Sequence, residues 1–208
     1  INDHSYEILK KNKSIINEEK IKTYTIIDET FDFVLAIGGD GTILESAKLI
    51  GKISTPVIGL NKGRLGFLAN SNTDDINQIL SNIKLSKFQI SERTIIKGIV
   101  NGIEYNALNE ISVSRKNTTS LITIETKLNQ QFLNTYWADG LIVSTPTGST
   151  GYSLSCGGPI IMPESKNLVL TPIAPHNLNA RPLVIPDDKE ISISIESRED
   201  QYFISIDS

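Results

Sequence analysis

Cysteine is almost absent from this chain, since Cys156 is the only one among its 208 residues. A single thiol cannot form a disulfide within the chain, and it cannot supply the cysteine cluster of a structural zinc site. The sequence also has no surplus of basic residues: 20 Lys and Arg stand against 24 Asp and Glu, for a formal net charge of −4. Because nucleic-acid phosphates attract a basic face, this balance argues against a nucleic-acid partner and favours a small-molecule one.

Long apolar runs are lacking too. No stretch has the length needed to cross a bilayer, and the opening residues INDHSYEILKKNK lack the apolar core of a signal peptide. We therefore expect a cytoplasmic protein without a membrane partner. The chain starts at Ile1 rather than Met and finishes on the strand-like YFISIDS, so we expect both ends to be truncated.

The most informative stretch is FDFVLAIGGDGTIL, residues 31–44. Its apolar run stops at two glycines and is followed by apolar residues at helical spacing, which predicts a strand, a glycine turn and a helix that opens near Thr42. Adjacent glycines let a ligand approach the backbone closely, and a helix N-terminus suits a phosphate. Asp40 has two interpretations: it caps the helix, or it holds a metal ion or takes a proton from a nucleophilic hydroxyl.

The first half of the sequence predicts an α/β domain with a parallel, Rossmann-like sheet. We expect a helix over residues 4–19, a strand over 24–27, and a further buried strand over 56–61 that completes a β-α-β unit. Asn and Asp at 72–75 then predict the start of a helix that runs through Ile83. Ligands of such sheets bind at the carboxyl ends of the strands, where the glycine turn lies.

The second half predicts a mainly antiparallel β domain. β-branched residues dominate it, Asn101-Gly102 is a strong signal for a two-residue hairpin turn, and one short helical segment follows Gly148. We place the domain boundary near residue 93. The two domains are then residues 1–93, which carry the glycine turn, and residues 94–208.

Polar groups gather at two places in this second half. Asn109-Glu110 could grip a sugar or a base edge, although an ordinary solvated strand end is the simpler interpretation. Farther on, glycines are interleaved with hydroxyls in a pattern that suits phosphates or ribose, and a Ser/Thr-rich linker is the alternative. The hydroxyls belong to Thr145, Thr147, Ser149, Thr150, Ser153 and Ser155. Asp139 could accept from a polar ligand group, and Tyr152 could stack on a planar ring or simply pack.

Together these segments resemble the NAD kinases. The resemblance rests on GGDGT at 38–42, Asn109-Glu110, DGLIVSTPTGSTGYSLSCGGPII at 139–161 and LTPIAPHNLNARPLVI at 170–185. It implies transfer of the γ-phosphoryl of ATP, or of polyphosphate in some members, to the 2′-hydroxyl of the adenosine ribose of NAD, which yields NADP. It also implies an α/β domain followed by a β domain, a divalent cation (Mg or Mn), and a homodimer or homotetramer with a shared site.

The resemblance assigns roles to individual residues. Asp40 would be the general base and Gly41 would lie beside the ligand. NAD would be bound by Asn109, Glu110, Asp139, Thr150, Gly151, Tyr152, Ser153, Leu154 and Ser155. The cation would travel with the nucleotide phosphates, so no protein ligand is named for it.

Two other functions share part of this pattern. Lipid kinases carry a close version of the GGDGT turn, and a non-catalytic dinucleotide sensor would bind NAD without turning it over. Competing nucleotide motifs are missing, because no G-x-x-x-x-G-K-[ST] occurs and the turn lacks the third glycine of the dinucleotide fingerprint.

Several single residues have less specific interpretations. We expect Trp137 to fill core rather than stack on a ring, although relatives often carry a basic residue at its position. We expect His176 to be structural and Cys156 to be a packed side chain rather than a nucleophile. Lys62 and Arg64 either meet ATP phosphates or are solvated loop charges.

Overall fold

The structure is a computed structural model that describes residues 27–51, 53–61, 66–69, 71–117, 120–197 and 201–207. It consists of two compact units, one up to Ile90 and one from Ser91 onward. The expected boundary near residue 93 lies close to this division. The helix expected over 4–19 and nearly all of the strand expected over 24–27 lie outside the described residues.

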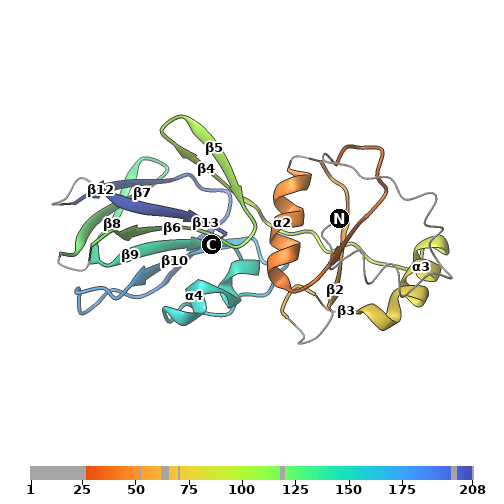
Figure 1. Ribbon diagram of the computed structural model, residues 1–208. Coiled ribbons are helices and arrows are strands. Elements are labelled where there is room, and N and C mark those ends of the chain that lie inside the picture. Colours follow the sequence, from red (N-terminus) through yellow and green to blue (C-terminus); the bar gives the residue numbers. More distant parts are fainter. Residues whose placement is uncertain are drawn as a thin grey trace. The chain divides into compact units, whose positions relative to one another are not determined.

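The first unit contains the predicted parallel sheet (Figure 1). Its strands are β1 (Val34–Ile37), β2 (Val57–Asn61) and β3 (Ser71–Asn72), in the order β1-β2-β3. Both strand pairs are parallel, with Val34 opposite Val57 and Leu60 opposite Ser71. The apolar run, the glycine turn and the next apolar run therefore form the β-α-β unit that the sequence predicts, with α2 (Asp40–Ile50) as its helix.

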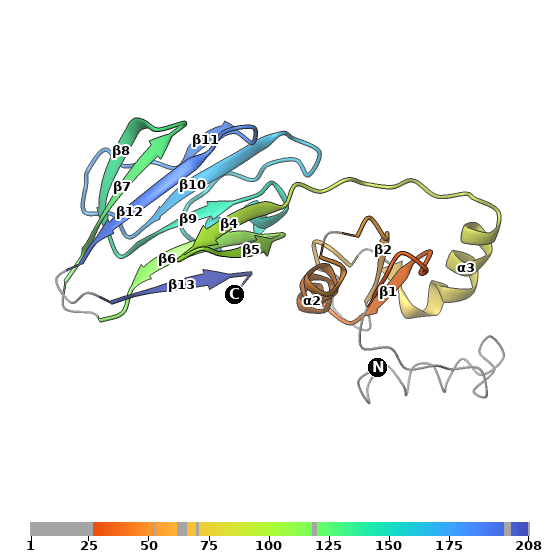
Figure 2. The same cartoon turned by 90° about the horizontal axis from the view of Figure 1, so that it is seen from above.

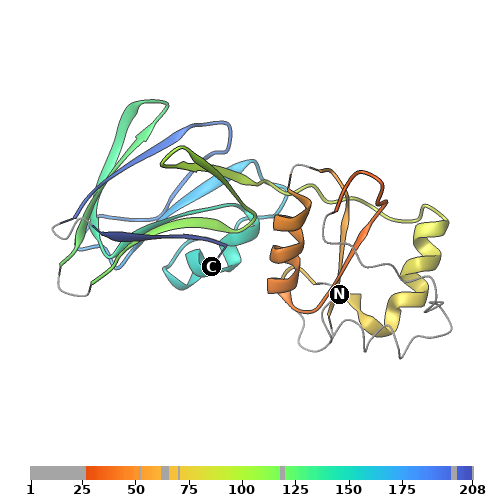
Figure 3. The same ribbon diagram turned by 45° about the horizontal axis from the view of Figure 1, so that its top comes forward.

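Helices cover both faces of this sheet, as the orange and yellow coils of Figure 3 show. Gly59 has no side chain on the face of β2 that meets α2, where Ile43 fills the space. The next residue, Leu60, points to the opposite face and packs with Ile76 of α3 (Ile76–Lys84). A short 3-10 helix, η2 (Thr73–Asp75), leads into α3, and a reciprocal capping box between Asn72 and Asp75 confirms the predicted helix start.

The second unit is built of antiparallel strands in two layers, which Figure 2 shows from above. One layer has the order β11-β10-β9-β6-β13 and the other has the order β12-β7-β8. The first consists of β6 (Glu110–Arg115), β9 (Gly140–Ser144), β10 (Asn167–Ile173), β11 (Leu183–Pro186) and β13 (Tyr202–Ile206). The second consists of β7 (Ile122–Leu128), β8 (Gln131–Ala138) and β12 (Ile191–Glu196).

A hairpin and a helical segment complete this unit. The hairpin joins β4 (Ile96–Val100) to β5 (Ile103–Ala107) through Asn101 and Gly102, whose φ angles of 51° and 78° are those of the predicted two-residue turn. The predicted helical segment begins at Thr147 and consists of η3 (Thr147–Thr150) and α4 (Tyr152–Ser155).

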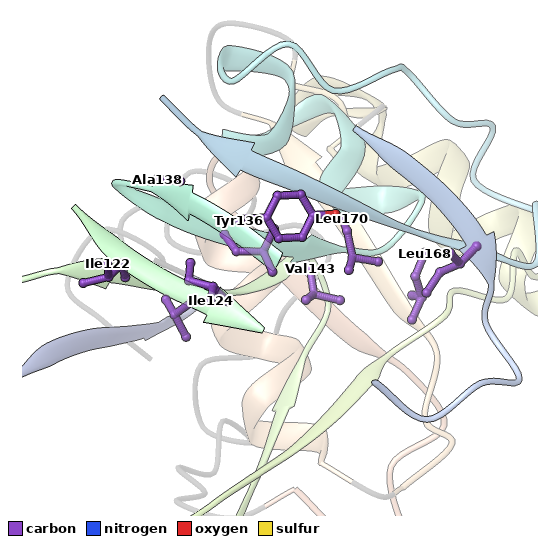
Figure 4. Close-up of a cluster of buried hydrophobic side chains, with 10 residues drawn as sticks. Ile122, Ile124, Tyr136, Ala138, Val143, Leu168 and Leu170 are labelled. Atoms are coloured by element: carbon purple, nitrogen blue, oxygen red, sulfur yellow. The ribbon is translucent and has the colours of Figure 1, made fainter. Parts of the chain in front are cut away.

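The core of the second unit lies between its two layers (Figure 4). Ile124 and Tyr136 enter it from β7 and β8, and Val143 and Leu170 enter it from β9 and β10. Each such side chain contributes about 1.5–3 kcal/mol by leaving water. β9 is buried along its whole length, so the segment that follows it starts from a fixed point. Within the described ranges, no helix combines the length and apolar character that a bilayer crossing requires.

Candidate functional site

In the first unit, Asp40 is the first residue of α2 and follows the glycine turn at the carboxyl end of β1. The residue that caps this helix is Gly39, and no side chain caps it. The helix-cap interpretation of Asp40 is therefore wrong. Its carboxylate has other partners.

Three consecutive backbone N–H groups donate hydrogen bonds to the Asp40 carboxylate. The amide of Phe67 donates to Oδ2 at 2.9 Å, and the amides of Leu68 and Ala69 donate to Oδ1 at 3.1 and 3.2 Å. A carboxylate has about four acceptor positions, so these bonds fix its orientation and leave about one position for a further donor. A side-chain acid is thus held rigidly at the carboxyl edge of a parallel sheet, where ligands of such sheets bind.

The backbone on both sides of Asp40 is open. At Gly39 and at Gly41, an added Cβ atom would meet no described atom within 4 Å, and both residues are exposed. A ligand could therefore contact the main chain at the N-terminus of α2, where the helix dipole and free amides favour a phosphate.

In the second unit, the structure brings Asn109 and Glu110 together with the glycines of the helical segment. The backbone oxygen of Asn109 accepts from the Thr145 amide at 2.8 Å. A methyl group at Gly148 would lie 2.1 Å from that same oxygen, so only glycine allows this close packing. At Gly151, a methyl group would lie 3.4 Å from Glu110 Oε2 and 3.8 Å from Asn109 Nδ2.

Three buried polar atoms of this region have no hydrogen-bond partner among the described residues. They are Asn109 Oδ1, Ser144 Oγ and Thr147 Oγ1. Buried polar groups are nearly always paired in native proteins, because an unmade hydrogen bond costs about 1–3 kcal/mol. Asn109 Oδ1 is therefore a candidate contact for a polar ligand.

Most of the hydroxyls that the sequence offers to a ligand hold the segment itself. Thr145 Oγ1 donates to the Leu108 carbonyl at 2.6 Å, Ser149 Oγ donates to the Pro146 carbonyl at 2.6 Å, and Ser153 Oγ lies 2.8 Å from Thr171 Oγ1. The side chains of all three hydroxyl residues are fully buried. The linker interpretation is therefore wrong, and the hydroxyls stabilise a fixed loop rather than facing outward as a row.

The residues of α4 that remain accessible are Tyr152, Leu154 and Ser155. Tyr152 is 43% exposed, and its hydroxyl makes a hydrogen bond with Cys156, one helical turn on. Burial raises the pKa of Tyr152 above its usual value, and the neighbouring Cys156 and the charge of Asp139 raise it further. Tyr152 is therefore a neutral hydroxyl with an accessible ring at neutral pH.

Asp139 forms an ion pair that the sequence did not reveal. Arg115 Nε lies 2.9 Å from Asp139 Oδ1 and Arg115 Nη2 lies 3.0 Å from Oδ2, a bidentate arrangement. Gly140 pairs with Ser114, whereas Ser144 pairs with Glu110, so Asp139 and Asn109 lie at opposite ends of β9. At the usual rise per residue, these ends are roughly 13 Å apart.

The prediction that Trp137 fills core is wrong. It is 48% exposed, and its ring centroid lies 4.7 Å from that of His176 at an interplanar angle of 59°. Alternation along β8 explains this, because Tyr136 and Ala138 point to the core and Trp137 points away. The ring of His176 packs on Trp137 and its amide donates to the Trp137 carbonyl, and its structural role stays a prediction. Lys62 and Arg64 lie outside the described residues.

In the part of the chain that the structure describes, no three His, Cys, Asp or Glu side chains are placed to hold a metal ion.

Comparison with known proteins identifies the family. The model of the ATP-NAD kinase N-terminal domain matches residues 2–87, and that of the ATP-NAD kinase C-terminal domain matches residues 108–208. The chain belongs to the ATP-NAD kinase family. The two matches together cover most of the sequence.

Curated relatives carry the same family name. The chain is 51% identical over 209 residues to the NAD kinase of Flavobacterium psychrophilum, with 97% of this chain and 71% of the relative covered. It is 54% identical to the NAD kinase of Flavobacterium johnsoniae, where 88% of this chain and 64% of the relative are covered. The Christiangramia forsetii NAD kinase is 47% identical over 100% of this chain and 73% of its own length.

Solved structures of NAD kinases share the fold. The yeast NADH kinase complexed with NADH superimposes with a TM-score of 0.78 at 33% identity, over 85% of this chain and 52% of that one. An NAD kinase from Archaeoglobus fulgidus in complex with ATP gives a TM-score of 0.77 at 28% identity, over 100% of this chain and 81% of that one. The predicted fold class is confirmed.

Two residues of this NAD kinase family member that sequence reasoning missed are Arg115 and Asp207. Arg115 ends β6 in an alternating strand and has no local motif around it. Asp207 lies 97 residues after Glu110 in the chain, so no local pattern connects the two. Both depend on antiparallel pairing between distant strands, which a single sequence does not show.

Proposed function

We propose that the protein catalyses the NAD kinase reaction, in which the γ-phosphoryl group of ATP moves to the 2′-hydroxyl of the adenosine ribose of NAD and gives NADP. Family membership supports the reaction class. The observation that carries the binding assignment is the buried Asn109 amide oxygen, which has no partner in the described part of the chain. The amide nitrogen of the same side chain would lie 3.8 Å from a methyl group at Gly151.

In this proposal Asp40 is the general base. The ribose oxygen attacks the γ-phosphorus, the bond to the bridging oxygen of ADP breaks, and the ribose proton passes to a carboxylate oxygen of Asp40. A sugar hydroxyl is much less acidic than a carboxylic acid, so the proton moves as the new bond to phosphorus forms. The three amides that hold Asp40 support this role, because they fix the acceptor before the reaction.

NAD binding is assigned to residues of the second unit, and Gly41 is proposed as a ligand contact. Asn109 and Glu110 form hydrogen bonds with polar edges of the dinucleotide, and the accessible ring of Tyr152 packs on one of its planar groups. Ser153 acts through its backbone, because its side chain is buried against Thr171. The remaining proposed contacts are Asp139, Thr150, Gly151, Leu154 and Ser155.

In this proposal a divalent cation, magnesium or manganese, binds together with ATP. The described residues offer no cluster of acidic side chains for it, so no step is assigned to a protein-bound metal. When it is bound to the phosphates, the cation neutralises their charge.

We also propose a cytoplasmic homodimer or homotetramer with a shared NAD pocket. Asp139 and Asn109 lie at opposite ends of β9, so a second subunit could bring its own Asp139 next to the Asn109 pocket. The lone cysteine of the chain is compatible with a reducing compartment.

The test is NADP formation from NAD, ATP and magnesium, compared between the wild type and Asp40→Asn. Loss of the base should lower kcat by about 10²–10⁴-fold and leave both KM values nearly unchanged. The matched control is Asp32→Asn, an exposed residue of the same unit that undergoes the same charge change, and its kcat should equal that of the wild type.

Two outcomes would contradict the proposal at different points. Undiminished turnover of folded Asp40→Asn would remove Asp40 as the base. A wild-type protein that forms no NADP would contradict the reaction itself. Phosphorylation of diacylglycerol by that same protein would favour the lipid-kinase alternative, and NAD binding without ADP release would favour a sensor.

A further inference from the structure

A buried carboxylate at the end of β13 holds the segment that carries Asn109 and Glu110. Asp207 follows that strand and is only 5% exposed. Its Oδ2 accepts from the Leu108 amide at 2.8 Å, and its Oδ1 accepts from the amides of Asn109 and Glu110 at 2.7 and 3.1 Å. Three consecutive backbone donors thus converge on a single acid.

The contact is reciprocal and is fixed by strand pairing. The Asp207 amide donates to the Glu110 carbonyl at 3.0 Å, directly beyond the pairing of Ile206 with Ile111. The φ angle of Asp207 is +49°, in the left-handed region that few residues other than glycine, Asn and Asp adopt. Such a conformation costs free energy, and the surrounding bonds maintain it.

The segment is also held from its other side. The Asn109 carbonyl accepts from the Thr145 amide, and Gly148 packs directly against the Asn109 backbone. Asp207 and the helical segment therefore hold the Asn109 backbone from two sides. The amide oxygen of the Asn109 side chain has no described partner and can accept a hydrogen bond from a ligand. A small shift of this backbone would redirect that side chain, and misplacement of about 1 Å can cost a hundredfold in activity.

We propose that Asp207 is a positioning residue for NAD: it makes no contact with the dinucleotide and sets the direction of the Asn109 and Glu110 side chains through their backbone amides. This inference rests on the proposed function, because NAD is the ligand it names. It predicts a selective effect on NAD, because the side-chain hydrogen bonds of Asp207 all go to the segment that carries Asn109 and Glu110.

The decisive variant is Asp207→Asn. Asn tolerates the left-handed backbone, but its amide NH₂ would face one or more of the three N–H donors, so at least one hydrogen bond is lost. We expect KM for NAD to rise about tenfold or more, KM for ATP to change by less than about twofold, and the Kd of NAD in calorimetry to rise in parallel with its KM. Hydrogen exchange should accelerate at Leu108, Asn109 and Glu110 but not in β7.

The matched control is Asp188→Asn, an exposed acid of the same unit whose side chain pairs with Lys189. It undergoes the same charge change and should leave both KM values unaltered. If Asp207→Asn does not fold, Asp207→Gly repeats the measurement, because glycine removes the carboxylate and relieves the positive φ.

The outcomes separate this inference from the proposed function. A wild-type protein that neither binds NAD nor forms NADP would overturn both. If the wild type is active, an unchanged KM for NAD in folded Asp207→Asn would overturn the positioning role alone. A parallel rise of both KM values, or loss of folding in both variants, would show a general structural requirement and would likewise overturn it.

Discussion

At the scale of single residues, Asp40 and Asp207 accept the same pattern of hydrogen bonds but have different proposed roles. Asp40 and Asp207 each accept from three consecutive backbone amides, one at Oδ2 and two at Oδ1. Asp207 is buried, so its carboxylate binds the backbone of residues 108–110 and is not accessible to a ligand. Asp40 is only half-buried and lies between two open glycines, so its remaining acceptor position can meet a ligand.

Cys156 allows a prediction about pH at the same scale. Burial raises the pKa of its thiol, and the hydrogen bond from Tyr152 lowers it by a smaller amount. A raised pKa means that the folded state keeps the proton, so this contribution to stability is present below the unfolded pKa and is lost as pH rises through the folded pKa. The affected window starts near the ordinary thiol value of about 8.5 and extends upward.

The measurement is alkylation of Cys156 by iodoacetamide as a function of pH, followed by mass spectrometry. We expect the midpoint of the rate to lie at higher pH in the native protein than in the urea-unfolded chain, because only the thiolate reacts. Tyr152→Phe removes the hydrogen bond that lowers the pKa and should move the native midpoint farther upward. A native midpoint at or below that of the unfolded chain would contradict the burial argument.

At the scale of elements, the sequence predicts the local structure well because its signals are local. The glycine turn, the capping box at Asn72 and the hairpin at Asn101 all lie within a few residues of the structure they determine, and the structure confirms them. The partners of Asp40, Asp139 and Asp207 could not be predicted, because they lie 24 to 99 residues away. The exposure of Trp137 depends on which alternate residues of β8 face the core, and the local sequence does not show this.

The N-terminus of α2 gives a prediction that separates stability from function. Ala is a better helix former than Gly, and a methyl group at Gly41 would meet no described atom within 4 Å, so Gly41→Ala should stabilise the first unit by up to about 1 kcal/mol. If NAD approaches the backbone there, the same methyl group should reduce NADP formation roughly tenfold or more by displacing the ligand.

Thermal unfolding and initial rates on the same preparation test this prediction. Glu45→Ala serves as the control, since Glu45 is an exposed residue of α2 and should leave the rate unaltered. A more stable Gly41→Ala variant with full activity would show that no ligand approaches the backbone at this point.

At the scale of the whole molecule, the family matches fall on the two compact units, with one match in residues 2–87 and the other in 108–208. Each unit carries part of the proposed chemistry: an acid beside two open glycines in the first, and a fixed polar segment around Asn109 in the second. Two of the proposed NAD contacts, Asp139 and Asn109, lie at opposite ends of β9, and this separation bears on the proposed oligomer. Asp139 is held by Arg115 at one end and Asn109 is held by Asp207 at the other.

A shared pocket predicts that two defective variants restore each other. If each site takes Asn109 from one subunit and Asp139 from its neighbour, Asn109→Ala and Asp139→Asn should each be poorly active alone. After unfolding and refolding as an equal mixture, about half of the dimers are mixed and one of their two sites is intact, so about a quarter of the wild-type activity should return. The control mixes two separately refolded variants without exchange, which should give only the sum of their own rates. If co-refolding gives no more than that sum while wild type treated in the same way recovers its activity, each pocket is complete within one chain and Asp139 does not serve a neighbour.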